Sequence, residues 1–207
     1  LSEINSDNIC DFASEKSSVI FKLAPIFEKE MNEVEVFNLF EKIEIPLTKV
    51  LAKMELEGVA LDVEMLQNYS TQLTSELQLL ENKIHQLADE GFNISSPKQM
   101  GEILFEKLEL SKKPKKTKSG QYSTSEETLL KLKDTHPIIV EILNFRGVKK
   151  LLSTYVDALP ELVNNETKRI HTTFNQSIAS TGRLSSVNPN IRNIPIRTKR
   201  GMKVREA

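Results

Sequence analysis

The stretch STGRLSSVNPNIRNIPIRTKRG, residues 180–201, is rich in side chains that bind ligands and poor in side chains that build a core. It carries two arginines, Arg183 and Arg192, and three asparagines, Asn188, Asn190 and Asn193. Arginine offers a fixed positive charge and several N–H donors, and asparagine offers both donors and an acceptor. These residue types on one loop-like segment are suited to an anionic partner that also presents hydrogen-bonding groups.

The charge of the chain is divided unevenly between its ends. Residues 168–207 contain nine Lys and Arg and one acid, whereas the first 167 residues contain 19 basic and 28 acidic side chains. The net charge of −1 hides this asymmetry. An acidic body with a basic end is typical of a chain that presents one face to a polyanion, although a basic tail without a defined partner has the same composition.

Composition excludes several classes of protein. With 39% hydrophobic residues among 207, the chain can bury a core of ordinary size. No apolar run approaches the roughly 18 to 20 residues of a membrane span, and the N-terminus lacks a signal-peptide pattern, so we expect a cytoplasmic protein without a membrane partner. Cys10 has no Cys or His neighbour at metal-ligand spacing and is expected to pack as a small hydrophobe.

The elements that must position the ligand-binding stretch are predicted to be mainly helical. Apolar residues recur at helical spacing over residues 11–31 and 33–56, with Pro25 and Pro46 expected to kink or bend these runs. Gly58 is then expected to end a helix before a short extended segment.

The most regular pattern predicts a long helix over residues 64–90, with Asp62 as its N-cap. At 1.5 Å per residue this helix would be about 40 Å long, and its apolar strip needs a partner helix. A matching strip lies between residues 137 and 159. We therefore predict an antiparallel helical stalk.

Two short helices are predicted at the tip of this stalk. SSPKQ places Ser96 as an N-cap with Gln99 as its reciprocal partner, and STSEE places Thr124 in the same role with Glu127. Between them, SKKPKKTKSG carries five lysines within residues 112–118. This run is either a mobile solvated loop or a source of salt-sensitive, sequence-independent attraction to phosphates.

Short strands and turns are predicted after residue 159. RIHTTF, residues 169–174, has the pattern of a strand. The alternating apolar and charged residues of the terminal MKVREA predict the beginning of another strand. The fold expected is mainly α, with a long stalk, short tip helices and a small truncated β portion at the C-terminus. Because the chain starts without methionine and stops within the strand-like alternation of MKVREA, we expect it to be a fragment of a longer protein.

The ligand-binding stretch closely resembles a segment of the family-A DNA polymerases, the family of bacterial DNA polymerase I. TGRLSS, PNIRNIP and IRT stand where the family carries TGRLSS, PNLQNIP and a basic residue at the entry to its palm domain. IPLTKVLAKMELEGVALD, FNISSPKQMGEILFEKL, STSEETL and FRGVKKLLSTYVDALP are similar to family thumb segments in the same order. The resemblance implies the end of a 3′→5′ exonuclease-like domain at 1–32, a thumb at 33–160 and the start of a palm at 161–207.

The resemblance implies that the complete protein is a DNA-directed DNA polymerase, a nucleotidyltransferase of DNA replication and repair. Its implied partners are primer-template DNA and deoxynucleoside triphosphates, its cofactor is Mg²⁺, and its location is the nucleoid in the cytoplasm. The family carboxylates that hold Mg²⁺ follow the point where this chain stops, so we expect no catalytic residue, no metal site and no polymerase activity in the fragment. The alternative is a noncatalytic helical scaffold that binds nucleic acid or protein.

A polymerase must hold every DNA sequence equally well, which the minor groove permits because its acceptors recur at nearly the same positions in every correct base pair. A long donor such as Arg183 can therefore test base-pair geometry, and the resemblance implies this role at the primer terminus. Arg197 resembles the family residue that approaches the incoming triphosphate. The implied DNA-binding set is Arg183, Asn190, Arg192, Asn193, Arg146, Lys150, Asn93, Ser96, Ser123 and Thr124.

Several members of this set have a structural alternative, and two positions depart from the family. Ser96 and Thr124 would cap helices with or without DNA, and Asn190 and Asn193 could simply hold turns. Arg192 stands where the family usually has Gln.

In proofreading members the N-terminal helix carries Tyr-x-x-x-Asp, for which this chain has Phe12 and Lys16. An ammonium group repels Mg²⁺, so we expect no proofreading at this site. Metal-dependent exonuclease activity of that domain in the complete protein would contradict this expectation.

Overall fold

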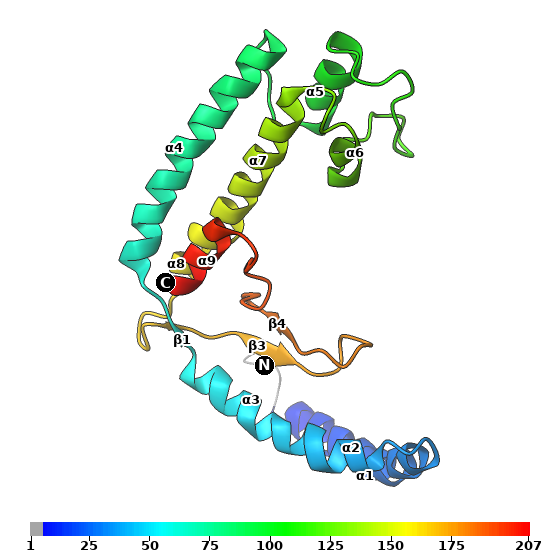
Figure 1. Cartoon of the computed structure of the whole chain (residues 1–207). Coiled ribbons are helices and arrows are strands. Elements are labelled where there is room, and N and C mark those ends of the chain that lie inside the picture. Colours follow the sequence, from blue (N-terminus) through cyan, green and yellow to red (C-terminus); the bar gives the residue numbers. More distant parts are fainter. Residues whose placement is uncertain (1–5) are drawn as a thin grey trace. The chain divides into compact units, whose positions relative to one another are not determined.

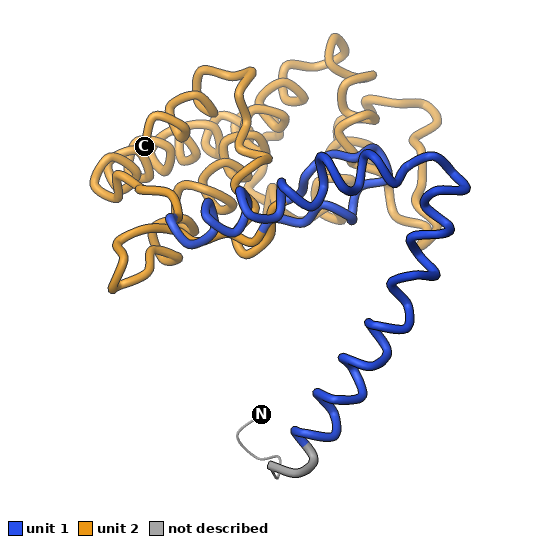
Figure 2. The backbone as a smooth tube through the Cα atoms, turned by 90° about the horizontal axis from the view of Figure 1, so that it is seen from below, with its two compact units in different colours: residues 1–57, 174–185 blue, residues 58–173, 186–207 orange. Residues whose placement is uncertain are grey.

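The computed structural model describes residues 6–207 (Figure 1) and divides the chain into two compact units (Figure 2). Unit 1 comprises residues 1–57 and 174–185, and unit 2 comprises residues 58–173 and 186–207. The chain passes between the units at Gly58 and at the strands β3 (Thr173–Asn175) and β4 (Ser185–Val187). Within residues 6–207, no helix is long and apolar enough to cross a membrane.

Unit 1 is helical at its N-terminal end, as the periodicity predicted. Its elements are α1 (Ser6–Glu33), α2 (Phe37–Leu39), the π-helical η1 (Phe40–Glu44) and α3 (Ile45–Glu57). Pro25 lies inside α1, which continues through it without a break. The irregular turn η1 directly precedes α3, whose second residue, Pro46, lacks the N–H that would continue the α-helical hydrogen bonds.

The apolar face of α1 remains open to solvent. Phe12 is 54% exposed, Ile20 67% and Phe27 52%. Cys10 is also exposed, so the prediction that it packs in a core is wrong. Helical periodicity shows which side of a helix is apolar, but it does not show what covers that side.

The predicted stalk is confirmed in unit 2. Helices α4 (Val63–Ala88) and α7 (Pro137–Leu151) lie side by side and antiparallel (Figure 1), and η3 (Leu152–Val156) and α8 (Ala158–Glu161) extend the second one. Asp62 caps α4 as predicted, because its carboxylate accepts from the N–H of Met65 at 2.8 Å. The fully buried side chains of the stalk include Leu66, Leu73, Ile84, Ile138, Ile142 and Val148.

The tip contains α5 (Pro97–Glu102), the π-helical η2 (Ile103–Lys107) and α6 (Glu126–Lys131). Ser96 caps α5, its Oγ accepting from Gln99 N at 3.4 Å. The side chain of Gln99 does not return to Ser96, because its Oε1 accepts from the N–H of Asn93 at 2.7 Å.

The predicted cap of α6 is shifted by one residue. Ser125 is the N-cap, and its Oγ accepts from Thr128 N at 3.4 Å. Thr124 is 6% exposed, and its hydroxyl accepts from Arg146 instead. Both residues are chemically able to cap a helix, so a tertiary contact decided between them.

The β portion is small. Strand β1 (Val59–Ala60) pairs antiparallel with β2 (Arg169–Ile170). The strand predicted over residues 169–174 is interrupted at His171 and Thr172, which separate β2 from β3.

The terminal strand prediction is wrong, because MKVREA belongs to the helix α9 (Lys199–Glu206). Thr198 caps α9, its Oγ1 accepting from Gly201 N at 3.1 Å. Val204 is 2% exposed and packs with Tyr69 of α4 in the core of unit 2. Alternation over six residues fits a short strand, but docking of one apolar side chain on the stalk favours the helix.

Candidate nucleic-acid interface

The segment that carries Asn190, Arg192 and Asn193 is held by internal hydrogen bonds. Ser186 is 1% exposed, and its Oγ accepts from Arg192 N at 3.3 Å and donates to Asn190 Oδ1 at 3.4 Å. Asn190 Oδ1 also accepts from Asn193 N at 3.2 Å. The buried hydroxyl of Thr172 donates to the carbonyl of the proline before Asn190 at 2.7 Å. The backbone is thereby fixed, while the side chains of Asn190, Arg192 and Asn193 stay exposed.

A groove of about 630 Å³ lies beside this segment. Lys150 of α7 and Tyr155 of η3 line it together with Asn190 and Asn193. The structure therefore brings together three residues that the sequence proposed for one ligand, Lys150, Asn190 and Asn193. Gly147, one turn before Lys150, also lines the groove, and a Cβ there would meet no atom within 4 Å.

Arg146 is directed toward the tip and does not line the groove. Its guanidinium donates to the carbonyl oxygen of Thr124, to Thr124 Oγ1 at 3.1 Å and to Met100 Sδ at 3.1 Å. Burial lowers the pKa of this guanidinium, and the carboxylate of Glu126 acts in the opposite direction. The resemblance implied a DNA contact for both Arg146 and Lys150; in the structure the guanidinium of Arg146 connects α7 to the tip.

The other tip residues surround the starts of two short helices. Asn93 Oδ1 accepts from Ser95 N at 2.9 Å, and the hydroxyl of Ser123 lies 3.2 Å from that of Thr128. Lys149, which sequence reasoning missed, donates from Nζ to Ser95 Oγ at 2.5 Å. Lys149 stands next to Lys150 in FRGVKK, so the sequence showed that two lysines lie at this end of the helix. Which of them turns toward the tip depends on the rotation of α7 about its axis.

Three of the five tip lysines, Lys115, Lys116 and Lys118, lie on a hydrogen-bonded hairpin, and Lys112 and Lys113 precede it. The N–H of Thr117 donates to the carbonyl of Gln121 at 2.7 Å, and the N–H of Ser123 donates to that of Lys115 at 2.8 Å. Lys116 Nζ lies 5.2 Å from the centroid of the Tyr122 ring. All five lysines are exposed, so the hairpin presents a concentrated positive charge.

Arg183 and Arg197 project from different units of the chain. Arg183 is exposed in unit 1 and follows Gly182, whose φ of 69° turns the chain in a conformation that favours glycine. Arg197 is exposed in unit 2, just before Thr198 caps α9.

The arrangement of acidic, histidine and cysteine side chains bears on whether a metal ion could bind. Among residues 6–207, no group of three or more His, Cys, Asp and Glu side chains is arranged to hold a metal ion, whereas Mg²⁺ requires several oxygen ligands.

In α1, Lys16 Nζ lies 4.2 Å from the centroid of the Phe12 ring. The two residues that depart from the family motif thus contact each other.

Arg146→Lys is expected to loosen the tip while the stalk stays folded. Lysine keeps the charge but cannot present two donors in a fixed fork to Thr124. We expect a loss of about 1–2 kcal/mol in local stability, since one charged hydrogen-bonding group is replaced by a poorer donor. Amide hydrogen exchange over residues 122–132 measures this loss. The control is Lys150→Ala, one turn away on the exposed side of α7; equal exchange in the two variants would contradict the anchoring role.

Residues 63–207 match the family model described as DNA polymerase family A. The chain is 52% identical over 189 residues to DNA polymerase I of Synechocystis sp. and 43% identical over 203 residues to DNA polymerase I of Bacillus subtilis. These alignments cover 90% and 98% of this chain but 19% and 23% of the two relatives, so the chain spans about a fifth of their length.

Among solved structures, the fold is similar to the POL domain of Pol1 from M. smegmatis in complex with DNA primer-template and dNTP. The TM-score is 0.79 at 38% sequence identity, and the match covers 90% of this chain and 33% of that chain.

Proposed function

Because the chain belongs to DNA polymerase family A, we propose that it forms the primer-template-binding part of a DNA-directed DNA polymerase. The observation that carries this proposal is the fixed segment of residues 188–193 beside the groove, where Lys150, Asn190 and Asn193 come together. The relative from M. smegmatis was solved with DNA primer-template and dNTP, and this supports the same two partners here.

The geometry suits binding that does not depend on DNA sequence. The backbone N–H groups of Arg192 and Asn193 are held by the Ser186 hydroxyl and by Asn190 Oδ1, so exposed donors are presented on a rigid frame. Minor-groove acceptors recur in every correct base pair, and such donors can bind them without reading sequence. Arg183 and Arg192 add charge that attracts the phosphate backbone.

The tip contributes in two ways in this proposal. The exposed lysines of residues 112–118 attract phosphates of the duplex behind the primer end. Asn93, Ser96 and Ser123 lie on the same part of the molecule and serve as polar contacts to that duplex. Thr124 acts through Arg146, because its hydroxyl and carbonyl are both occupied by the guanidinium.

Arg197 is the residue proposed to approach the triphosphate of the incoming nucleotide. In the complete protein, a divalent metal, which we propose to be Mg²⁺, would activate the primer hydroxyl and stabilise the leaving pyrophosphate. The part assigned to this chain in the proposal is to bind and orient the primer-template and the nucleotide. We propose further that residues 1–32 end an exonuclease-like domain, 33–160 form the thumb and 161–207 begin the palm, and that the protein works at the nucleoid.

The test is a titration of the complete protein against a fluorescent primer-template at several salt concentrations, followed by primer extension with dNTPs. The logarithm of the association constant falls as the logarithm of the salt concentration rises, with a slope of about −0.9 for each neutralised phosphate. Changing the five tip lysines to Gln should therefore make this slope shallower by about two to four. A matched control changes five exposed lysines of unit 1, Lys22, Lys29, Lys42, Lys49 and Lys53, to Gln.

The control variant should keep the slope of the unmodified protein. Absence of primer extension by the unmodified protein would contradict the proposed function. Equal slopes for the two lysine variants would contradict the role of the tip.

A further inference from the structure

Two tyrosines from the two stalk helices hold the C-terminal segment at two points. Tyr155, in η3, donates its hydroxyl to the carbonyl oxygen of Asn193 at 2.7 Å. Tyr69, in α4, donates its hydroxyl to the carbonyl oxygen of Arg200 at 3.1 Å. Their side chains are almost fully buried, at 7% and 5% exposed, so both rings also belong to the core.

The residues between these two points carry the proposed nucleotide contact. Ile194 packs against the core of unit 2, whereas Ile196 is 56% exposed and Arg197 is exposed. The segment therefore leaves the core after Ile194 and returns at α9. A long side chain such as Arg197 reaches a defined place only if its backbone is held, and the tyrosine hydroxyls hold that backbone on both sides of it.

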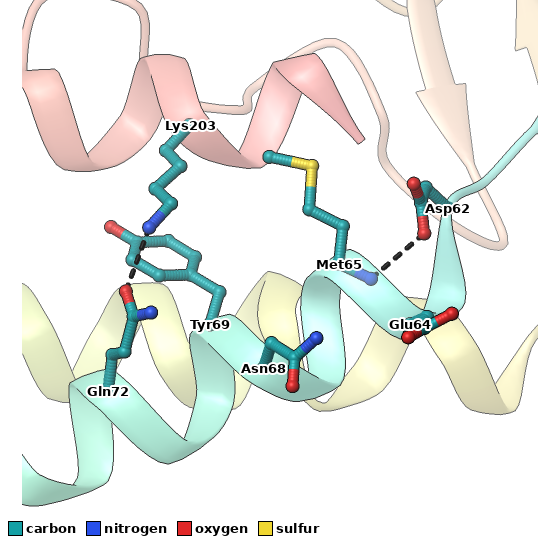
Figure 3. Close-up of a pocket in the computed structure, with 7 residues that line it drawn as sticks. All are labelled: Asp62, Glu64, Met65, Asn68, Tyr69, Gln72 and Lys203. Carbon is teal, nitrogen blue, oxygen red and sulfur yellow. Dashed lines mark hydrogen bonds between the residues drawn. The ribbon is translucent and has the colours of Figure 1, made fainter.

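The surroundings of Tyr69 keep its hydroxyl available as a donor. Lys203 reaches from α9 across the Tyr69 ring to Gln72, with Nζ 4.5 Å from the ring centroid and 2.8 Å from Gln72 Oε1 (Figure 3). Burial raises the pKa of Tyr69 and is the largest influence on it. Arg200 and Glu76, which form an ion pair with each other, act on this pKa in opposite directions: Arg200 lowers it and Glu76 raises it. Because the shift is upward from a phenol's usual range, the hydroxyl stays protonated through neutral pH.

We propose that Tyr69 and Tyr155 are positioning residues, whose hydroxyls fix residues 193–200 so that Asn193 and Arg197 meet primer-template DNA and the incoming nucleotide. Each hydroxyl binds a backbone carbonyl, so it acts on the path of the segment and not on a particular side chain. The inference rests on the proposed function, because it assigns a task within the same site.

The experiment compares Tyr69→Phe, Tyr155→Phe and the double variant in the complete protein. Phenylalanine keeps the ring and its packing and removes only the hydroxyl. Each single change should raise KM for dNTP about three- to ten-fold, as expected for one hydrogen bond, with kcat within about two-fold. Tyr155→Phe should also raise Kd for primer-template about three- to ten-fold, because its partner is the backbone of Asn193.

The third tyrosine of the chain provides the matched control. Tyr122 lies at the tip, where burial and a hydrogen bond with Glu106 raise its pKa. It packs against the core cluster of the tip, whereas Ile194 packs against the other core cluster of unit 2. Tyr122→Phe should leave KM for dNTP unchanged.

Hydrogen exchange of the backbone N–H groups within residues 193–200, measured on the complete protein without DNA, gives a second readout that does not depend on activity. Exchange should be faster in Tyr69→Phe and Tyr155→Phe and unchanged in Tyr122→Phe. If the unmodified protein does not extend primers, the proposed function fails, whatever the exchange shows. If the protein extends primers but Tyr69→Phe and Tyr155→Phe keep its KM for dNTP and its exchange rates, the positioning role is overturned. It is also overturned if the control Tyr122→Phe changes KM and exchange as much as the two stalk variants do.

Discussion

Arg183→Ala in the complete protein should lower kcat/KM for primer extension about 10- to 100-fold, the range expected when one charge-assisted hydrogen bond is lost. Arg183 is exposed, and the backbone turns at Gly182 immediately before it, so its side chain is presented to solvent. If it tests the minor-groove acceptors of the terminal base pair, the loss should be greater on a paired primer end than on a mispaired one. Steady-state extension from both kinds of primer measures this difference.

The matched control for this prediction is Arg205→Ala. Arg205 is exposed on α9, so its removal also takes one positive charge from the basic C-terminal part of the chain. A general loss of charge should change kcat/KM less than about two-fold at physiological salt, because exposed charges are screened. Equal losses in the two variants would show that Arg183 contributes only charge, and would contradict its role at the primer terminus.

Gly201→Ala should cause the largest loss of stability among the changes considered. A Cβ at this position would lie 2.7 Å from Pro195 Cβ and even closer to the Pro195 carbonyl oxygen. The contact is with backbone, which cannot move aside as the end of a flexible side chain can. We expect the free energy of unfolding to fall by about 2–3 kcal/mol, as for overpacking at a closed contact. Urea unfolding of the chain measures it.

Gly147→Ala is the control, because both glycines lie inside helices. Helix propensity alone predicts that alanine stabilises each site by about 1 kcal/mol. At Gly147 a Cβ would meet nothing within 4 Å, so that gain should be observed. Stabilisation by both substitutions would contradict the close approach of α9 to Pro195.

Local patterns were enough to predict the framework of this molecule. The three- and four-residue spacing of apolar side chains predicted both stalk helices, and the caps Asp62 and Ser96 were found from residue type and position. These features depend on neighbours within one or two helical turns, so they can be recognised in sequence. The same reasoning failed at the last residues, where six alternating positions predicted a strand and the chain forms α9.

The resemblance likewise identified the residue types of the candidate site, but not their partners. Arg146 and Lys150 are one turn apart on α7, yet Arg146 binds Thr124, 22 residues away, and Lys150 lines the groove. Nothing near Tyr155 in the sequence shows that its hydroxyl binds a carbonyl 38 residues further along the chain.

The sequence by itself therefore determined the helical stalk, its caps and the donor-rich segment, because these follow from interactions between near neighbours. Tertiary structure alone decided that α9 is a helix, that a Cβ would be crowded at Gly201 and unhindered at Gly147, and that two tyrosines hold the segment. The path of the segment depends on contacts between residues distant in sequence, such as Tyr69 with Arg200, 131 residues apart, which form only when α9 packs on α4. The crowding at Gly201 depends on a turn that brings Pro195, six residues earlier, against α9.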